Sequence, residues 1–125
     1  MIGEEQLAVR VLAEVCSVYA DRNEALVNAG VIAMSRETSA FPGFGNLVDQ
    51  PDWQLVRLSQ EHGIVGLRAD RSTGNNVTAS ETFHLGQKVM IYCQHTCITA
   101  AAFHVYYVVD ENDVVCDAWT PWKGW

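Results

Sequence analysis

Short apolar runs, each ended after a few residues by a turn signal, constrain the fold of this chain more than any other feature of its sequence. Apolar and polar residues alternate in WQLVRLSQ and IVGLRAD on either side of EHG, where Gly63 can supply the positive φ of a tight turn. This pattern predicts a β-hairpin with Glu61 and His62 at its tip. Clear helical periodicity is scarce, so the runs indicate strands joined by turns.

The other apolar runs fit the same pattern. A strand is predicted for LAVRVLAEVCSVYADRN, although Leu7, Val11 and Val15 also recur at helical spacing and leave a helix open. Two strand pieces and a bend are predicted for EALVNAGVIAMS, which is interrupted by Gly30. Three strands in a meander are predicted for KVMIYCQHTC, AAFHVYYVVD and VVCDAW.

Two stretches have the composition of loops. The longest ordered loop is predicted for RETSAFPGFGNLVDQPD, and an exposed, mobile loop for the polar RSTGNNVTASET. A chain of 125 residues is about the size of one ordinary domain, and no internal repeat or domain boundary is evident. Residues 1–125 are therefore predicted to form one all-β domain, a small barrel or sandwich-like fold with short helical or irregular insertions.

The charge balance limits the class of partner. Fifteen acidic against eight basic residues give a formal net charge of -7, and no Lys/Arg cluster is present to replace the counterions of a phosphate backbone. Nucleic acid is therefore not expected as a partner. No apolar run approaches the roughly 20 residues of a membrane span, and the acidic start MIGEEQLAVR is unlike a basic secretory signal. We expect a soluble, cytoplasmic protein that does not bind membranes.

Apolar residues are abundant for a small domain. Hydrophobic residues make up 49% of the chain and charged residues only 18%, which predicts some apolar surface that meets a partner. The closing TPWKGW is predicted to dock on its own domain or on a neighbouring one. The four cysteines lie far apart, which favours reduced thiols, and Cys16 and Cys116 are predicted to be buried structural residues.

The stretch MIYCQHTCITAAAF holds the clearest candidate site. Alternation along a strand would place Cys93, His95 and Cys97 in one row on one face. Zinc binds a thiolate at about 2.3 Å and an imidazole nitrogen at about 2.0 Å, so His95 and Cys97 could share one ion with coordination positions left open. A half-buried strand that merely contains polar residues is the alternative, and Cys93 is either a third ligand or an inert core thiol.

Other candidates are weaker. Glu61 and His62 could form an acid/base pair, or they could belong to a solvated turn. His84 and His104 have no evident partner in the sequence. No nucleophile motif such as Gly-x-Ser-x-Gly and no phosphate-binding glycine pattern occurs. We therefore assign no catalytic and no cofactor-binding residue.

Several segments together resemble a known family. They are EVCSVYADRNEALVNAGVIAMSRETSAFPGFG, LSQEHGIV, LGQKVMIYCQHTCITAAAFHVYYVVDEN and WTPWKGW. In this order they are similar to the C-terminal domain of eukaryotic D-serine dehydratase in its fungal form, a domain that the related D-threonine aldolases share. The resemblance covers nearly the whole chain, and RSTGNNVTAS is its least characteristic part.

The resemblance implies an enzyme of two domains. An N-terminal alanine-racemase-like (β/α)₈ barrel of fold type III carries pyridoxal phosphate on a lysine, and a C-terminal β domain carries the metal ligands. Lys88 and Lys123 do not lie in anything that resembles the cofactor-lysine segment. This chain is therefore expected to be the second domain alone, as a fragment or a truncated product. Its expected partner is the pyridoxal phosphate barrel, in cis or in trans, within a possible homodimer.

The family's metal-binding histidine and cysteine fall on His95 and Cys97. The resemblance implies a His-x-Asp ligand pair in the aldolases, and the harder aspartate ligand suits manganese or magnesium. A thiolate ligand favours zinc instead. Cys97 thus points to the dehydratase branch. Asn28 and Ile32 stand where relatives often have aspartate and lysine, so no active-site role is assigned to residues 28–33.

The activity that the resemblance implies is β-elimination of D-serine to pyruvate and ammonia. Pyridoxal phosphate would act as the electron sink, and zinc on His95 and Cys97 would stabilise charge on the leaving β-hydroxyl. Without a barrel, the chain is expected to be inactive. Two alternatives stay open: a manganese-dependent D-threonine aldolase domain, and a free-standing β module that docks on a barrel or another subunit through its apolar surface and Trp-rich tail.

Overall fold

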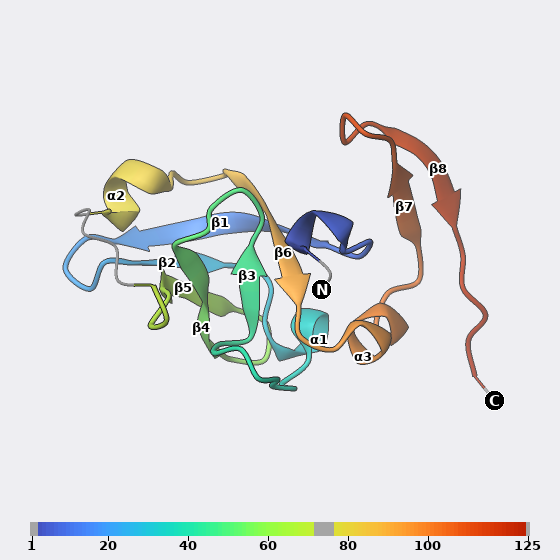
Figure 1. Cartoon of the computed structure of the whole chain (residues 1–125), viewed down its shortest axis with the longest axis horizontal. Helices are drawn as coiled ribbons and strands as arrows, with labels where there is room; N and C mark the ends of the chain where they lie inside the picture. Colours follow the sequence, from blue (N-terminus) through green and yellow to red (C-terminus); the bar gives the residue numbers. More distant parts are fainter. Residues whose placement is uncertain (1–2, 72–76, 125) are drawn as a thin grey trace.

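Six antiparallel strands close into a barrel, and two further strands form a hairpin beside it (Figure 1). The structure is a computed structural model that describes residues 3–71 and 77–124. The barrel strands are β1 (Val11–Tyr19), β2 (Glu24–Val27), β3 (Gly45–Leu47), β4 (Trp53–Leu58), β5 (Gly63–Leu67) and β6 (Lys88–Cys93). They follow the order β1-β2-β5-β4-β3-β6 around the barrel. The prediction of an all-β domain with a small barrel is confirmed.

In the part of the chain that the structure describes, one short helix precedes the first strand, and three lie in connections between strands. They are η1 (Glu4–Gln6), α1 (Val31–Met34), α2 (Ala79–Thr82) and α3 (Thr96–Ala101). Helices α1 and α3 lie together at one end of the barrel in Figure 1. The buried hydroxyl of Thr99 in α3 donates a hydrogen bond of 2.9 Å to the carbonyl oxygen of Met34 in α1. Within the described ranges, no helix is long and apolar enough to span a bilayer.

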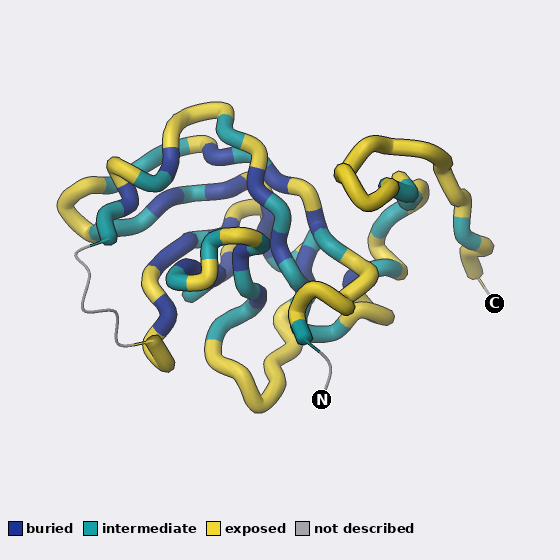
Figure 2. Tube along the Cα trace, turned by 45° about the horizontal axis from the view of Figure 1, so that its top comes forward, coloured by how far each residue is buried: buried dark blue, intermediate teal, exposed yellow. Residues whose placement is uncertain are grey.

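The core fills the barrel, where the alternating side chains of the strands meet. In β1, residues Val11, Ala13 and Val15 are buried, which settles the choice between strand and helix in favour of the strand. Trp53 of β4 is 1% exposed and packs edge-to-face against Phe83, with ring centroids 5.0 Å apart. Figure 2 shows the buried residues concentrated in the barrel strands.

The hairpin of β4 and β5 is confirmed, but Gly63 has a different role from the predicted one. Gly63 is not among the glycines with positive φ. A Cβ atom at this position would lie 2.5 Å from the carbonyl oxygen of Ala29, so the close approach of two backbones requires the glycine. The same turn accepts the start of α1, because the backbone N–H of Val31 donates to the carbonyl oxygen of Ser59 at 2.9 Å.

Three other predictions from local pattern are wrong. The second strand piece predicted in EALVNAGVIAMS is helix α1. The predicted meander does not form, because β6 pairs with β1 and β3, whereas β7 (Tyr106–Val109) pairs with β8 (Val115–Trp119). Cys16 and Cys116 are exposed and not buried, because Cys16 lies on the outer side of β1 and Cys116 belongs to β8, in which every residue is exposed.

The predicted loops are interrupted by short elements. The loop RETSAFPGFGNLVDQPD contains β3, whose residues pair with β4 and β6 and close the barrel. The polar loop RSTGNNVTASET contains α2, which begins after Thr78, and the Thr78 side chain accepts a hydrogen bond from the backbone N–H of Glu81. The centre of that loop, residues 72–76, lies outside the described residues, so its predicted mobility stays a prediction.

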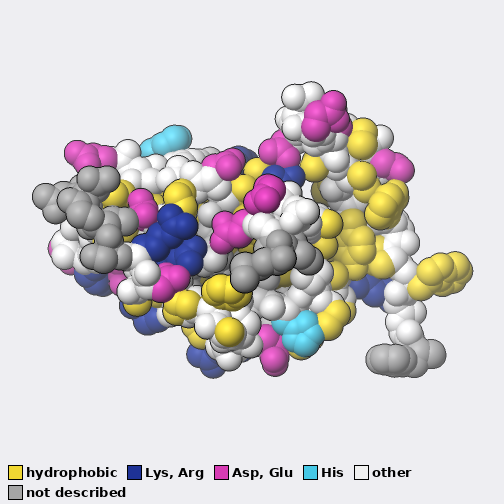
Figure 3. Space-filling view, viewed as in Figure 1, with side chains coloured by type: hydrophobic (Ala, Val, Ile, Leu, Met, Phe, Trp, Pro, Cys, Tyr) yellow, Lys and Arg dark blue, Asp and Glu magenta, His cyan; other side chains and the backbone are white. Residues whose placement is uncertain are grey.

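The β7–β8 hairpin has little contact with the barrel. Every residue of β8 is exposed, and Trp119 exposes 59% of its surface. Hydrophobic side chains gather on the hairpin and the tail in Figure 3. Among the described residues, two polar contacts link the hairpin to the rest of the chain: an ion pair of 2.5 Å between Arg10 and Asp113, and a hydrogen bond of 2.7 Å from the Tyr106 hydroxyl to the Ala100 carbonyl. The exposed Trp119 and Trp122 do not dock on the barrel, as one predicted alternative required; Trp125 lies outside the described residues.

Candidate metal centre

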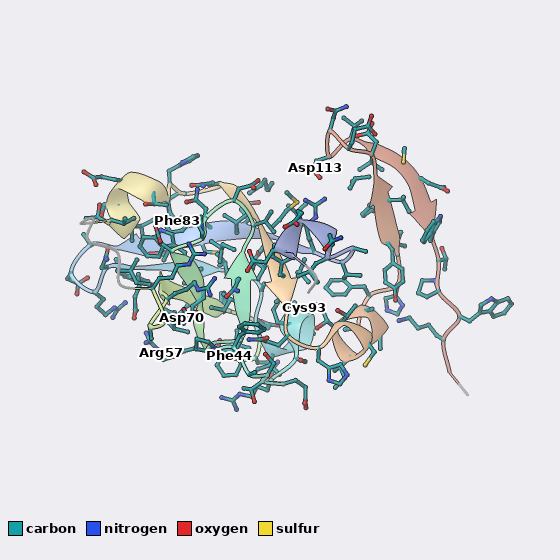
Figure 4. The ribbon with its side chains drawn as sticks, viewed as in Figure 1. Phe44, Arg57, Asp70, Phe83, Cys93 and Asp113 are labelled. Atoms are coloured by element: carbon teal, nitrogen blue, oxygen red, sulfur yellow. The ribbon has the colours of Figure 1, made fainter. Side chains whose placement is uncertain are left out.

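The candidate ligands lie where β6 passes into α3. Cys93, labelled in Figure 4, is the last residue of β6, and its Cα partner across the sheet is Gly45, the first residue of the short β3. Beyond this point the chain has no partner strand, and its backbone groups find partners within a helix instead. His95 is the N-cap residue of α3, and its carbonyl oxygen accepts a hydrogen bond of 3.1 Å from the N–H of Thr99.

The prediction that Cys93, His95 and Cys97 lie in one row on a strand face is therefore wrong. His95 precedes the helix with extended backbone angles, and Cys97 lies in its first turn. The two side chains nevertheless meet, because the Sγ atom of Cys97 contacts the Nε2 atom of His95. Cys97 is exposed and the His95 side chain exposes 42% of its surface, so the site is open to small molecules and to ions. Their role as metal ligands stays a prediction.

Cys93 does not join this contact. Its Sγ atom lies 3.7 Å from the Oγ1 atom of Thr96, and the side chain packs half-buried against the barrel core. These surroundings fit the prediction of an inert core thiol at Cys93 better than that of a third metal ligand. Across residues 3–71 and 77–124, no group of three or more His, Cys, Asp and Glu side chains is arranged to hold a metal ion. In the described chain, His95 and Cys97 are thus a pair.

The other edge of the imidazole ring faces a carboxylate that the sequence analysis missed. Atom Nδ1 of His95 lies 3.8 Å from Oε2 of Glu37, in the loop between α1 and β3. That loop is fastened beside the site by Gln94: the Ser39 hydroxyl donates to its Oε1 atom at 2.8 Å, and its Nε2 atom donates to the Gly43 carbonyl at 3.0 Å. No periodicity in RETSAFPGFG signals this contact, because irregular backbone creates it.

The other sequence candidates do not converge on a site. His62 takes part in its turn through backbone groups, since its N–H donates to the Ser59 hydroxyl and its carbonyl oxygen accepts from the Ser59 N–H. Glu61 and His62 are exposed, which fits the solvated turn better than an acid/base pair. His84 and His104 are exposed as well.

An acidic hollow of about 240 Å³ lies beside β6. Its lining residues are Glu4, Glu5, Leu47, Asp49, Pro51 and Tyr92. Burial raises the pKa of Tyr92, the nearby Arg10 opposes this shift, and the carboxylates of Glu4 and Asp49 add to it. Negative potential of this kind disfavours a phosphate group.

Neither lysine of the chain nor the hollow beside β6 fits pyridoxal phosphate. The amine of Lys88 is paired with Glu14 on the outside of the barrel, and the amine of Lys123 donates to the Ala101 carbonyl. The hollow beside β6 is lined by carboxylates and not by the cationic or N–H donors that a phosphate requires. No step of a reaction can be assigned to this cofactor on the present chain.

Comparison with known proteins places the chain in a family. Residues 8–109 match the family model described as "Putative serine dehydratase domain". The chain belongs to this family. It is 45% identical to the D-serine dehydratase of Schizosaccharomyces pombe, over 99% of this chain and 29% of that protein. The D-serine dehydratase of Saccharomyces cerevisiae is 36% identical, over 99% of this chain and 30% of that protein. The family prediction is confirmed.

A solved member of this group has the same fold. The D-threo-3-hydroxyaspartate dehydratase from Delftia sp. HT23 superposes with a TM-score of 0.81 and 33% identity, over 97% of this chain and 34% of that chain. This serine dehydratase domain thus spans about 30% of the length of the relatives it matches. The Delftia enzyme has also been solved with a histidine replaced by alanine and, in a metal-free form, with a cysteine replaced by alanine.

The two altered residues of the Delftia enzyme, the histidine and the cysteine, lie two positions apart. In the present sequence, a histidine followed two positions later by a cysteine occurs only as His95 and Cys97. D-threonine aldolase from Filomicrobium marinum shares the fold, with a TM-score of 0.66 at 24% identity.

Proposed function

We propose that this chain is the metal-presenting domain of a pyridoxal phosphate- and zinc-dependent D-serine dehydratase, which eliminates D-serine to pyruvate and ammonia. The observation that carries the proposal is the contact between Cys97 Sγ and His95 Nε2 at the start of α3. The shared His-x-Cys spacing in a metal-binding relative supports it. So does the 45% identity to a D-serine dehydratase over nearly the whole chain.

The donor set fits zinc. A thiolate and an imidazole nitrogen are common zinc ligands, and a sulfur donor favours zinc over manganese or magnesium. Two protein ligands leave coordination positions open for solvent or substrate, and the exposure of both side chains gives access to them. When bound, zinc would supply a Lewis acid that stabilises negative charge on the β-hydroxyl of the substrate, a poor leaving group.

The residues of this chain have a binding and orienting role. His95 and Cys97 hold the ion, and the first turn of α3 fixes the spacing of their backbones. The Thr99 to Met34 hydrogen bond ties α3 to the barrel end, so the ligands project from a supported element. Because neither lysine of the chain nor the hollow beside β6 fits pyridoxal phosphate, we infer that elimination requires the alanine-racemase-like domain, in cis or in trans, and that this chain alone is inactive.

The substrate class follows from the relatives. D-serine and D-threo-3-hydroxyaspartate, the substrates in the relatives' names, are both 3-hydroxy D-amino acids. We place D-serine first because the two fungal D-serine dehydratases are 45% and 36% identical to this chain, whereas the D-threo-3-hydroxyaspartate dehydratase is 33% identical. D-threonine aldolase chemistry is the second candidate, and the thiolate of Cys97 speaks against it because the aldolase ligand set is expected to be harder.

Metal titration of the purified chain tests the proposal. We expect one zinc ion per chain, with cobalt in its place giving the thiolate charge-transfer absorption of a sulfur-ligated site. Equilibrium dialysis measures the stoichiometry, and absorption spectroscopy identifies the sulfur ligand. Failure to bind a stoichiometric ion, or a cobalt spectrum without a thiolate band, would contradict the proposal. Preferential binding of manganese would instead favour the aldolase.

We propose that the β7–β8 hairpin docks on an alanine-racemase-like domain, which we expect in the remaining length of the relatives. A two-stranded hairpin is marginally stable in water by itself. The superposition on the Delftia enzyme covers 97% of this chain, and that enzyme has about three times its length. The exposed, apolar hairpin of this chain therefore has a fold neighbour with further chain that could cover such a surface.

Hydrogen exchange of the isolated chain tests the docking proposal. The amides of β7 are expected to exchange at least about 100-fold faster than those of β6, because the uncovered hairpin opens locally without unfolding of the barrel. NMR-detected exchange in the same sample compares Val108 with Ile91, which is fully buried in the barrel. Equal protection of the two strands would mean that the hairpin is stable alone and needs no partner.

A further inference from the structure

The two nitrogen atoms of the His95 imidazole ring face two different groups, a thiol and a carboxylate. Its Nε2 atom contacts the Sγ atom of Cys97, and on the other edge its Nδ1 atom faces the Oε2 atom of Glu37 at 3.8 Å. A histidine binds a metal through one nitrogen only when that nitrogen carries no proton, and the partner of the other nitrogen decides this. A carboxylate beside Nδ1 favours the tautomer with hydrogen on Nδ1.

The position of Glu37 is set by hydrogen bonds that join its loop to the ligand segment. Helix α1 ends at Met34, whose carbonyl oxygen accepts from the buried Thr99 hydroxyl of α3 at 2.9 Å. The backbone N–H of Glu37 then donates to the Ser35 hydroxyl at 3.3 Å. The chain before Glu37 and the helix after His95 are thus joined at one buried point.

The chain after Glu37 is fastened by the residue that precedes His95. The side chain of Gln94 accepts from the Ser39 hydroxyl at 2.8 Å, and it donates to the carbonyl oxygens of Phe41 at 3.3 Å and Gly43 at 3.0 Å. The loop is therefore held on both sides of Glu37. The carboxylate stays near His95 although 54% of its side chain is exposed.

We propose that Glu37 is a positioning residue of the metal centre: it accepts the Nδ1–H of His95 and so keeps Nε2 free to bind the ion. This inference rests on the proposed function and extends it to a residue outside the ligand pair. The separation of 3.8 Å is longer than a hydrogen bond, so the proposal requires a small rotation of the His95 or the Glu37 side chain to bring the two atoms within range. Binding of a cation at Nε2 strengthens Nδ1–H as a donor, so the two interactions support each other.

Zinc affinity of Glu37→Ala provides the first test. Loss of an outer partner of a metal-ligating histidine typically costs about 10–100-fold in metal affinity, and we expect a rise of about 10-fold in the zinc dissociation constant because Glu37 is partly exposed. Glu37→Gln keeps a hydrogen-bond acceptor but loses the charge. Its zinc dissociation constant is expected to lie between those of Glu37→Ala and the wild type. Glu111→Ala is the matched control, because it removes an exposed glutamate from the turn between β7 and β8.

The tautomer of His95 provides the second test, and it requires no metal. In long-range ¹⁵N–¹H spectra of the zinc-free chain at mildly alkaline pH, His95 is expected to carry hydrogen on Nδ1, and Glu37→Ala is expected to shift it towards hydrogen on Nε2. A wild-type His95 with hydrogen on Nε2, or equal zinc affinity in Glu37→Ala and Glu111→Ala, would overturn the role of Glu37. A wild-type chain that binds no zinc but has the expected tautomer would overturn the proposed function and leave the Glu37 contact supported.

Discussion

Replacing Cys97 by alanine is expected to raise the zinc dissociation constant of the chain by more than about 100-fold. This effect is larger than the loss of a residue that only hydrogen-bonds to a metal ligand, which typically costs about 10–100-fold. Cys97 would supply the only thiolate of a site with two protein ligands, and its Sγ atom already contacts the Nε2 atom of its partner His95. Removal of the sulfur leaves a single imidazole, which holds zinc weakly. Competition with a chromophoric chelator measures the change.

Two cysteine controls make this result specific. Cys116→Ala removes another exposed thiol, and Cys93→Ala removes the nearby half-buried one. Both variants are expected to keep zinc affinity within about 3-fold of the wild type, far below the effect of losing a ligand. His95→Ala is expected to match Cys97→Ala. If Cys116→Ala weakened binding as much as Cys97→Ala, the bound metal would be distributed over surface thiols and the site would be refuted.

The sequence predicted most reliably those elements whose pattern and pairing are both local. The β4–β5 hairpin joins two alternating runs across a short turn, so its register depends on residues that are neighbours in the chain. Strand β1 was predicted from the alternation in its own run, but the same residues left a helix open, and only the burial of Val11, Ala13 and Val15 in the barrel decides for the strand. The barrel followed from the number of such runs and the shortage of helix.

The end of β6 could not be predicted from its own residues. The alternation of YCQHTC continues past Cys93, but the pairing strand β3 has only 3 residues and begins at Gly45. The length of a partner far away in sequence therefore decides where the strand stops. The helix that follows still brings His95 and Cys97 together, because the extended N-cap residue His95 is followed directly by the first helical turn, which holds Cys97.

The contact between Glu37 and His95 could not be predicted from the sequence for a related reason. It depends on the buried Thr99 to Met34 hydrogen bond and on the hydrogen bonds of Gln94 to the loop, which join segments more than 50 residues apart. Hydrophobic periodicity carries no information on such contacts between irregular segments. The acidic hollow beside β6 likewise arises from residues of η1 and the β3–β4 connection that only the closed barrel brings together.

Replacing Trp53 by alanine is expected to lower the free energy of unfolding by about 3–5 kcal/mol, as for other buried tryptophans. Trp53 is 1% exposed at the first position of β4, and its ring packs against Phe83. The cavity left inside a closed barrel cannot collapse easily, since the strands around it are joined in a continuous hydrogen-bonded ring.

Urea denaturation of Trp53→Ala and Trp119→Ala, each followed by circular dichroism, measures this difference. Trp119 has the same side chain but exposes 59% of its surface on β8, so its replacement is expected to change the free energy of unfolding by less than about 0.5 kcal/mol. Because a domain of this size is stabilised by only about 5–15 kcal/mol, the Trp53 variant should unfold at a much lower urea concentration. Equal losses for the two variants would mean that the hairpin belongs to the same cooperative unit as the barrel, and would contradict both the core assignment and the independent opening of the hairpin.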